Sequence, residues 1–213
     1  RGYEIINKLI KTADVFVENF RPGAAKRLGL AYDDVQTLKP DIVYCSLSAY
    51  GQDGPLSHRK GYDHVLQGTT GVMSLTGTPE IGPVKAGLPF IDFATGLNGA
   101  FAISAALYER QKTGKGSCID IAMLDSTLLL MSNIITDHVI TGVVPELMGN
   151  EPQSRSATAG VFDAKDRPIL IAANSDIQFK ALMTALGLKE LIVDARFDTH
   201  HARLDNKTEL RKI

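Results

Sequence analysis

One acidic residue has the sequence context of a catalytic carboxylate. Asp92 follows the apolar run 88–91 and opens a long helical pattern, 93–112. Two interpretations are open. Aspartate is a favoured helix N-cap, which is the commoner use of such a residue. The free N–H groups and positive potential of a helix N-terminus could also keep a carboxylate ionised and stabilise an oxyanion beside it. A carboxylate placed there can attack an acyl group as a covalent nucleophile.

Basic residues form a second candidate site. Arg21, Lys26 and Arg27 follow an apolar strand pattern. Such a cluster is most often a solvated helix face. Guanidinium groups also stack on aromatic rings and form ion pairs with phosphates, so these residues are candidates for binding a nucleotide. Lys60 and Tyr62 follow a loop rich in glycine, proline and serine. Taken by itself, Tyr62 is more typical of a core residue whose hydroxyl has a partner than of a catalyst.

Several common motifs are absent from the sequence. It contains no GxxxxGK(S/T), no GxGxxG after a strand, no GxSxG, and no CxxC or HExxH. These absences disfavour a P-loop, a dinucleotide fold with its usual fingerprint, a serine hydrolase of the α/β type and a zinc site. We therefore expect no metal. The formal net charge of -1 creates no field that would attract nucleic acid or an anionic membrane, so neither is expected as a partner.

Composition is that of a globular protein. Of the 213 residues, 44% are apolar and 22% are charged, which is enough for one large core or for one domain and part of another. Cys45 and Cys118 both lie in apolar strand-like runs and are expected to be buried thiols. Thiols of this kind indicate a reducing compartment, so the predicted location is the cytoplasm, or the mitochondrial matrix in a eukaryote.

Alternating strands and helices position these residues. Strands are predicted at 14–20, 41–48 and 118–123, and helices at 24–28, 32–38, 63–75, 93–112 and 124–140. The helix 63–75 is expected to be interrupted by Gly68 and Gly71. This order is typical of an α/β fold with a Rossmann-like parallel sheet and long buried helices. The helix 93–112 is apolar on nearly every face, so we expect it to be central and buried. Its Asp, Asn and Gly residues make it a poor membrane span.

A change in composition at 142–158 predicts a domain boundary. We place the first domain at 1–145, and at 146–213 a linker with part of a small α+β domain. The second domain is expected to contain a hairpin (160–163 and 169–173) and helices at 176–186 and 200–213. Helical patterns run up to both ends of the sequence, so we interpret the chain as a fragment of a longer polypeptide.

An ordered series of motifs along the whole chain resembles class III CoA-transferases of the CaiB/BaiF type, a family that includes formyl-CoA and dicarboxylate CoA-transferases and α-methylacyl-CoA racemases. The matching segments are DVFVENFRPG (14–23), RLG (27–29), IVYCSLS (42–48), YGQDGP (50–55), GYD (61–63), GVMSLTG (71–77), PFIDFATG (89–96), KTGKG (112–116) and IDIAMLD (119–125). The tail, ARFD (195–198) to NKTEL (206–210), is similar to the small domain of that family. Residues 1–145 would then be part of a large CoA-binding domain.

The resemblance implies an enzyme whose nucleophile is Asp92. In the family, the matching aspartate attacks the thioester of a donor acyl-CoA and forms a mixed anhydride. The released CoA then gives an aspartyl-CoA thioester, from which CoA passes to an acceptor carboxylic acid. Coenzyme A would be a substrate, and no tightly bound cofactor is expected. The resemblance is closest to members that use dicarboxylates, although the sequence does not identify the donor or the acceptor acid.

The same resemblance assigns the CoA-binding residues. Arg27 matches a cation that stacks on the adenine of CoA, Arg21 falls near a companion cation, and Lys60 matches a position that contacts CoA. Tyr62 stands where racemases have a histidine, and an ordinary tyrosine, with a pKa of roughly 10, is a poor base near neutral pH. His64, two positions on, is not expected to replace that histidine. Transfer is therefore favoured over racemisation.

One segment departs from the family, and two further interpretations remain. The stretch GNEPQSRS (149–156) stands where some members have a run of glycines that folds over the thioester. Family dimers thread one subunit through the other, so an intertwined homodimer is expected for a complete protein. The alternatives to CoA transfer are a 2-methylacyl-CoA racemase or epimerase, and a non-catalytic Rossmann-like binding fragment in which Asp92 is only a cap.

Overall fold

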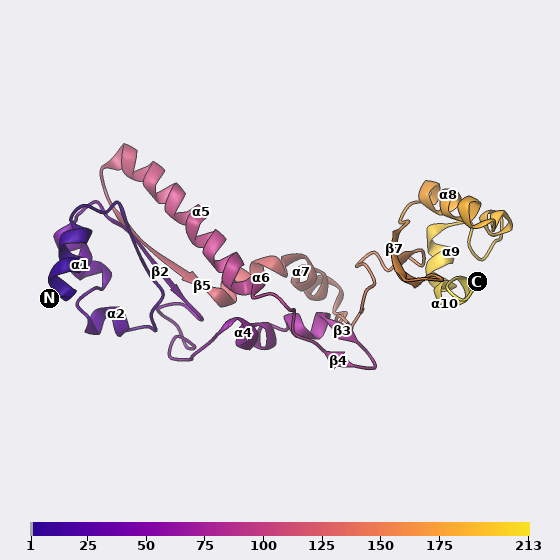
Figure 1. The fold of residues 1–213 in the computed structure, drawn as a ribbon, viewed down its shortest axis with the longest axis horizontal. Helices are drawn as coiled ribbons and strands as arrows, with labels where there is room; N and C mark the ends of the chain where they lie inside the picture. The colour runs from indigo at the N-terminus through magenta and orange to yellow at the C-terminus, as the bar shows by residue number, and fades with distance from the viewer. Residues whose placement is uncertain (1) are drawn as a thin grey trace. The chain divides into compact units, whose positions relative to one another are not determined.

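The protein forms two compact units. The computed structural model describes residues 2–213 (Figure 1). The first unit comprises the chain up to Thr76 together with Pro83–Glu146, and the second comprises Gly77–Gly82 and Leu147–Ile213.

A parallel sheet organises the first unit. Its strands are β1 (Val15–Glu18), β2 (Val43–Ser48) and β5 (Ser117–Ala122), in the order β1-β2-β5. Val43 of β2 pairs with Val15 on one side and with Ser117 on the other. The fold class predicted from the sequence, a mixed α/β protein with a parallel sheet, is confirmed. Because all three strands run the same way, the chain segments that follow them gather at one edge of the sheet, and β1 and β2 lead directly into the loops that build the site.

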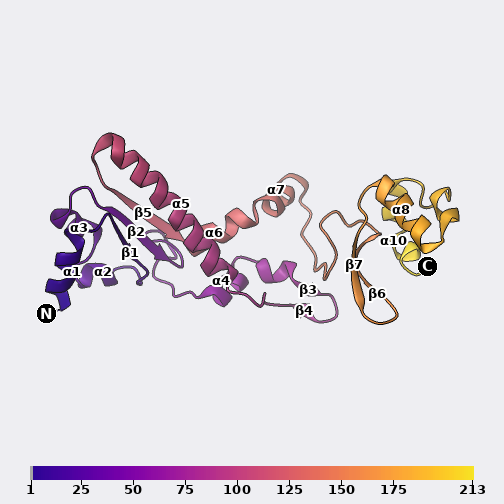
Figure 2. The ribbon, with the colours of Figure 1, turned by 45° about the horizontal axis from the view of Figure 1, so that its top comes forward.

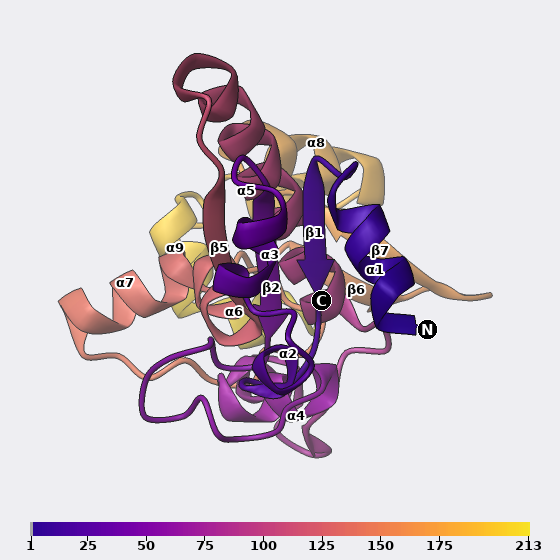
Figure 3. The same cartoon turned by 90° about the vertical axis from the view of Figure 1, so that its left-hand side faces the viewer.

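Helices cover both faces of β2. Successive side chains of a strand point to opposite faces of the sheet, so the apolar residues of β2 have packing partners on each side. Tyr44 packs with Ile10 of α1 (Gly2–Ile10) and Val35 of α3 (Tyr32–Leu38). Cys45 faces the other way, toward α5 (Phe90–Thr113). There Gly99 allows close approach, since a Cβ on it would lie 3.3 Å from Leu47 Cδ2 and 3.8 Å from Cys45 Sγ. Figures 2 and 3 show α5 alongside β2 and β5.

The long helix α5 is less buried than its sequence predicts. Ile91, Thr95 and Gly99 are its buried residues, and they form a single stripe. Phe93 and Phe101 lie outside this stripe and are 68% and 78% exposed. The prediction of a central, buried helix is therefore wrong within this chain, because only one face has the sheet to pack against. Among the described residues, α5 is the one helix long and apolar enough to cross a membrane, a property that core helices share.

Shorter elements complete the first unit. They are α2 (Ala24–Arg27), α4 (Asp63–Thr69), a 3-10 turn η1 (Val72–Leu75), α6 (Met123–Leu130) and α7 (Ser132–Thr141). The short strand β3 (Gly77–Thr78) belongs to the second unit and pairs with β4 (Gly82–Pro83). Two predicted helices are divided. The segment 63–75 turns at Gly71, whose φ is 86°, and the segment 124–140 breaks at Met131. Glycine at the first break is the residue that this left-handed conformation favours.

The second unit has its own core. An antiparallel hairpin of β6 (Ala159–Asp163) and β7 (Pro168–Ala172) precedes four helical segments, α8 (Asp176–Leu186), η2 (Lys189–Ile192), α9 (His200–Asp205) and α10 (Lys207–Leu210). Phe179, Met183 and Phe197 are the largest members of its buried cluster. The buried Arg203 lies over the Phe179 ring at 4.3 Å and donates to Phe197 O at 2.9 Å. The buried cluster therefore contains a cation, Arg203, whose guanidinium is hydrogen-bonded.

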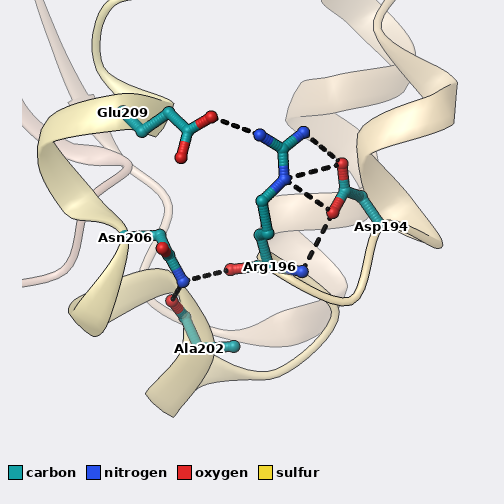
Figure 4. Close-up of polar contacts among 5 residues, drawn as sticks. All are labelled: Asp194, Arg196, Ala202, Asn206 and Glu209. Atoms are coloured by element: carbon teal, nitrogen blue, oxygen red, sulfur yellow. Dashed lines mark hydrogen bonds and ion pairs between the residues drawn. The ribbon is translucent and has the colours of Figure 1, made fainter.

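An ion-pair network fixes the turn between α9 and α10 (Figure 4). Arg196 Nη2 lies 2.6 Å from Asp194 Oδ2, and Arg196 Nη1 pairs with Glu209. Asn206 Nδ2 donates to Arg196 O at 3.2 Å and to Ala202 O at 3.0 Å. Hydrogen bonds from Arg196 lower the pKa of Asp194 to about 2. Arg196, Asn206 and Glu209 of the tail thus join parts of the second unit to one another.

The two cysteines differ in exposure. Cys45 is buried in β2, whereas Cys118 in β5 is exposed, and both are free thiols. The prediction of two buried thiols is therefore wrong for Cys118. In this chain β5 is an edge strand, so less of it is covered than of the central strand β2.

Candidate active site

A cavity of ≈ 440 Å³ in the first unit brings together most of the residues singled out in the sequence. Arg21, Lys60, Tyr62 and Asp92 all line it. The remaining lining residues are Asn19, Phe20, Pro22, Leu47, Ser48, Ala49, Arg59, Gly61, Thr95, Gly96 and Met123. Residues that follow β1, β2 and β5 thus meet the first turns of α5. This is the edge of a parallel sheet where ligands bind in open α/β folds.

Side-chain contacts hold the loop after β1 at the cavity. The buried Glu18 accepts a hydrogen bond from Ser46 and another, at 2.7 Å, from the N–H of Phe20. Asn19 Nδ2 donates to Leu47 O at 2.8 Å. Gln52 Nε2 extends this network by donating to Ser46 Oγ at 2.6 Å. Two side chains, Glu18 at the end of β1 and Asn19 at the start of this loop, are therefore hydrogen-bonded to β2. These bonds fix the loop that carries Arg21 and forms one wall of the cavity.

A second cavity of ≈ 500 Å³ adjoins Asp92 from the side of α4. Tyr62 and Asp92 line both cavities. The other lining residues of the second are Asp63, His64, Lys85, Gly87 and Pro89. Asp92 is thus accessible from two directions in this chain.

Asp92 is not the N-cap of its helix. The helix α5 begins at Phe90 after Pro89, and Asp92 lies in its first turn. Asp63 Oδ2, from α4, accepts from the N–H of Ile91 at 2.8 Å and from that of Asp92 at 3.4 Å. The cap interpretation of Asp92 is therefore wrong, because a side chain from another helix already performs that function. Asp63 also occupies two of the helix N–H groups that the sequence suggested could serve Asp92.

The charge of Asp92 is disfavoured by its surroundings. Asp92 is exposed to solvent within this chain. Partial burial still raises its pKa above the ordinary aspartate value, and the charge of Asp63 raises it further. A helix N-terminus alone would lower the pKa of a nearby carboxylate. Burial and the like charge of Asp63 both act against the effect of the helix end.

Three exposed cations line the first cavity together with this carboxylate. They are Arg21, Arg59 and Lys60. Among residues 2–213, none of the three has an ion-pair partner, although other cations such as Arg110 and Arg196 do. Cations without a counter-ion beside a cavity are available to an anionic ligand. Arg59 was missed in the sequence, where its position directly before Lys60 was the available signal.

Arg27 lies outside both cavities. It is the last residue of α2 and is exposed. Its Nη1 would lie 3.4 Å from a Cβ built on Gly23. Gly23 follows Arg21 and Pro22, which do line the first cavity. The guanidinium of Arg27 therefore lies just beyond that wall, separate from the other predicted residues.

Tyr62 is an accessible site residue and not a core residue. It is 68% exposed, and its ring stacks on that of His64 with centroids 6.1 Å apart. The local backbone is fixed by Gly61, where a Cβ would lie 2.5 Å from Leu66 Cδ2 and 2.7 Å from Ala49 Cβ. The interpretation of Tyr62 as a buried core residue is therefore wrong. The tight packing at Gly61 presents the neighbouring aromatic ring to the cavity.

No metal centre is found in the part of the chain that the structure describes. Groups of three or more His, Cys, Asp or Glu side chains placed to hold an ion do not occur there. The arrangement of one carboxylate, three cations and an aromatic ring fits an anionic acyl substrate, for which a carboxylate nucleophile is suited.

Three comparisons with known proteins give matches along the whole chain. A family model described as CoA-transferase family III matches residues 1–213. Succinyl-CoA:glutarate CoA-transferase from Mus musculus is 38% identical over the whole chain and 49% of its own length. Acetyl-CoA:oxalate CoA-transferase from Acetobacter aceti is 38% identical over 97% of the chain and 53% of its own length. The crystal structure of a CAIB/BAIF family protein from Brucella suis has a TM-score of 0.87 and 38% identity, covering 99% of the chain and 56% of that structure. The chain spans about half the length of the curated relatives that it matches.

Proposed function

Because this chain belongs to CoA-transferase family III, we propose that the protein containing it is an enzyme that transfers coenzyme A from an acyl-CoA to a carboxylic acid, with Asp92 as nucleophile. The observation that carries the proposal is the position of Asp92 on the wall of a cavity with three unpaired cations. Coenzyme A and carboxylic acids are anions, so such a cavity suits both substrates.

The proposed chemistry proceeds through two kinds of covalent intermediate. A carboxylate oxygen of Asp92 attacks the thioester carbonyl carbon, the C–S bond breaks, and CoA leaves as a thiolate. The product is a mixed anhydride. The thiolate then attacks the side-chain carbonyl carbon of Asp92, the donor acid leaves as a carboxylate, and an aspartyl-CoA thioester forms. Each step exchanges one activated acyl group for another, which divides a difficult transfer into easier ones.

The acceptor reverses this sequence. Its carboxylate attacks the aspartyl-CoA carbonyl carbon, expels the CoA thiolate and forms a second anhydride. The thiolate attacks the acceptor's acyl carbon, which yields the new acyl-CoA and frees Asp92. Negative charge develops on the attacked carbonyl oxygen at every step. Since Asp63 occupies the helix N–H groups of Ile91 and Asp92, the nearby cations Arg59 and Lys60 are proposed to stabilise that charge.

CoA is proposed to lie along the wall formed by the loop after β1. Arg21 and Lys60 line the cavity and would contact the phosphates. Arg27 lies just beyond Gly23, where the adenine would leave the cavity and stack on its guanidinium. Tyr62 would contact the reacting end, since it lines both cavities with Asp92. CoA is a substrate in this scheme, without a tightly bound cofactor.

The acyl groups are proposed to be dicarboxylates. Relatives are named for succinyl-CoA with glutarate and for acetyl-CoA with oxalate. A second carboxylate on the substrate needs a cation that CoA does not use, and three unpaired cations line one cavity. A panel of mono- and dicarboxylic acceptors with succinyl-CoA as donor would test this. Equal rates for glutarate and for a monocarboxylate of similar length would contradict it.

Mass spectrometry tests the nucleophile. The complete polypeptide containing this chain is incubated with succinyl-CoA and then with hydroxylamine, which converts an activated aspartyl group to a hydroxamate. The expected result is a hydroxamate at Asp92, and loss of activity in Asp92→Asn. An active Asp92→Asn enzyme without any adduct would favour the non-catalytic role of a binding fragment.

A racemase is the second candidate. One observation favours it, namely that His64 lines a cavity with Asp92 and stacks on Tyr62. A histidine and an aspartate on one cavity could exchange an α-proton. Incubation with a chiral 2-methylacyl-CoA in deuterated water decides between the two, because only racemisation incorporates deuterium at the α-carbon. We expect no incorporation.

An intertwined homodimer is proposed for the complete protein, in the cytoplasm or in the mitochondrial matrix of a eukaryote, with no nucleic acid or membrane as partner. The exposed apolar residues of α5, such as Phe93 and Leu97, support an assembly because they are uncovered in this chain. Further segments of the polypeptide or a second subunit would cover them. Light scattering on the complete protein should give twice the subunit mass.

A further inference from the structure

Two side chains of α4 hold the chain segment that carries Asp92. Asp63 is 7% exposed and Gln67 is fully buried. Asp63 Oδ2 accepts hydrogen bonds from Ile91 N at 2.8 Å and from Asp92 N at 3.4 Å. Asp63 thus caps a helix that is not its own and fixes the backbone of the first turn of α5. A buried carboxylate in this position would be costly without those donors.

Gln67 fixes the approach to that turn. Its Nε2 donates to Asp63 Oδ1 at 2.5 Å, and its Oε1 accepts from Ala86 N at 2.9 Å. A weaker contact of 3.4 Å joins Nε2 to Leu88 O. Gln67 therefore orients Asp63 and at the same time anchors the loop that leads into α5. Both halves of the amide group are used, so no other side chain of this shape reproduces the contacts.

Asp63 also sets the electrostatic environment of Asp92. Its carboxylate is hydrogen-bonded to the backbone of Asp92 itself, and after burial its negative charge is the second cause that raises the pKa of Asp92. A carboxylate with a raised pKa is more basic and is a stronger nucleophile when ionised. The other charged and titratable groups on the two cavities are Arg21, Arg59, Lys60, Tyr62, His64 and Lys85.

We propose that Asp63 and Gln67 form a positioning pair for the nucleophile, in which Gln67 locks the loop and Asp63 holds the Asp92 backbone and strengthens its carboxylate by like charge. This inference rests on the proposed role of Asp92 and adds two residues that do not touch the reacting atoms. Asp63 lines only the second cavity and Gln67 lines neither, so both lie outside the ≈ 440 Å³ cavity assigned to CoA. Changes in them should therefore alter the chemical step more than substrate binding.

Two variants separate geometry from charge in the complete enzyme. Asp63→Asn removes the charge and keeps one acceptor oxygen, so it also loses a hydrogen bond on one side, and the acid limb of the pH profile is the readout of the charge alone. The pKa of Asp92 should fall, and since activity needs ionised Asp92, the acid limb of the pH profile should move to lower pH. Gln67→Met keeps the volume but removes all three polar contacts. We expect kcat to fall about 10- to 100-fold with an unshifted acid limb, because the nucleophile is misplaced while the Asp63 charge remains.

Controls make each outcome decisive. Asp33→Asn removes an exposed carboxylate on α3, far along the chain from the site, and should leave kcat and the pH profile unchanged. Circular dichroism establishes that each variant is folded; if one is not, the other decides. If Asp63→Asn is folded and the acid limb of its pH profile is that of the wild type, the proposed charge effect is wrong. If Gln67→Met is folded and has the wild-type kcat, the proposed positioning role of Gln67 is wrong.

The hydroxylamine experiment tests the role of Asp92 as nucleophile separately from the roles of Asp63 and Gln67. A wild-type enzyme that forms a hydroxamate at Asp92, with both variants behaving like wild type, contradicts only the positioning pair. Absence of the adduct in the wild-type enzyme contradicts the nucleophile itself, and the positioning pair with it.

Discussion

Gly96 follows Asp92 by one turn of α5, and both residues line the same cavity of ≈ 440 Å³. A Cβ built on Gly96 meets no atom within 4 Å. The missing side chain leaves open space directly beside the carboxylate. Helix stability alone would favour alanine at such a position, so the glycine is better explained by substrate access than by folding.

Stability and activity should therefore respond in opposite directions to Gly96→Ala. Alanine in a helix interior should raise the free energy of unfolding by about 0.5–1 kcal/mol. Its methyl group projects into the cavity, so kcat/KM for the acyl-CoA should fall. Gly68→Ala is a matched control on α4, because Gly68 is helical and lines neither cavity. It should give the same gain in thermal stability with unchanged kinetics. A faster Gly96→Ala enzyme would contradict this role of the glycine.

The unpaired cations should act on substrate binding. Arg59→Met and Lys60→Met each remove one charge from the cavity wall but keep much of the apolar stem. We expect kcat/KM for succinyl-CoA to fall about tenfold in each, the usual size of one hydrogen bond to a charged group, because both binding and the charge developing on the attacked carbonyl oxygen lose a cation. The dependence of KM on salt should also weaken. Lys165→Met, in the exposed loop of the β6–β7 hairpin, is the control and should leave both quantities unchanged. Unaltered kinetics in Arg59→Met would remove it from the site.

Gly116 should be essential for folding. A Cβ at this position would lie 2.1 Å from the carbonyl oxygen of Ile42, a backbone atom at the start of β2. Because backbone cannot move aside as a flexible side chain can, Gly116→Ala should lower the free energy of unfolding by about 3 kcal/mol. Gly87→Ala is the control, since its Cβ would meet nothing within 4 Å. Urea denaturation measures both, and equal midpoints would show that β2 and β5 can separate without cost.

Thiol labelling should distinguish the two cysteines. Burial raises the pKa of Cys45 to about 11, so almost none of it is thiolate at pH 8. The pKa of the exposed Cys118 is also raised, by partial burial first and by the nearby Asp120 charge second. Iodoacetamide should therefore label Cys118 slowly and Cys45 only after unfolding, and the Cys118 rate should increase with pH. Rapid labelling of Cys45 in the folded protein would contradict its packing against α5.

Much of the fold follows from local sequence patterns. The three strands of the parallel sheet and the hairpin of the second unit lie where alternation and turn residues predict them. The failures have specific causes. Periodicity could not reveal that only one face of α5 has a partner in this chain. The interruption of the segment 63–75 was predicted from Gly68 and Gly71, and the structure has it at Gly71, whereas no residue of 124–140 indicated the break at Met131.

By itself, the sequence determined which residue types were available for chemistry: an aspartate at the start of a long helix, cations after the first strand, and an ordered set of motifs that resembles one family. Only the tertiary structure decided that Asp63 caps the helix of Asp92, that Arg59 lines the cavity and that Arg27 lies beyond its wall. These relationships join segments that are far apart along the chain. Local propensity carries no information about such contacts, because parallel strands and the helices between them bring distant residues together only when the whole layer has packed.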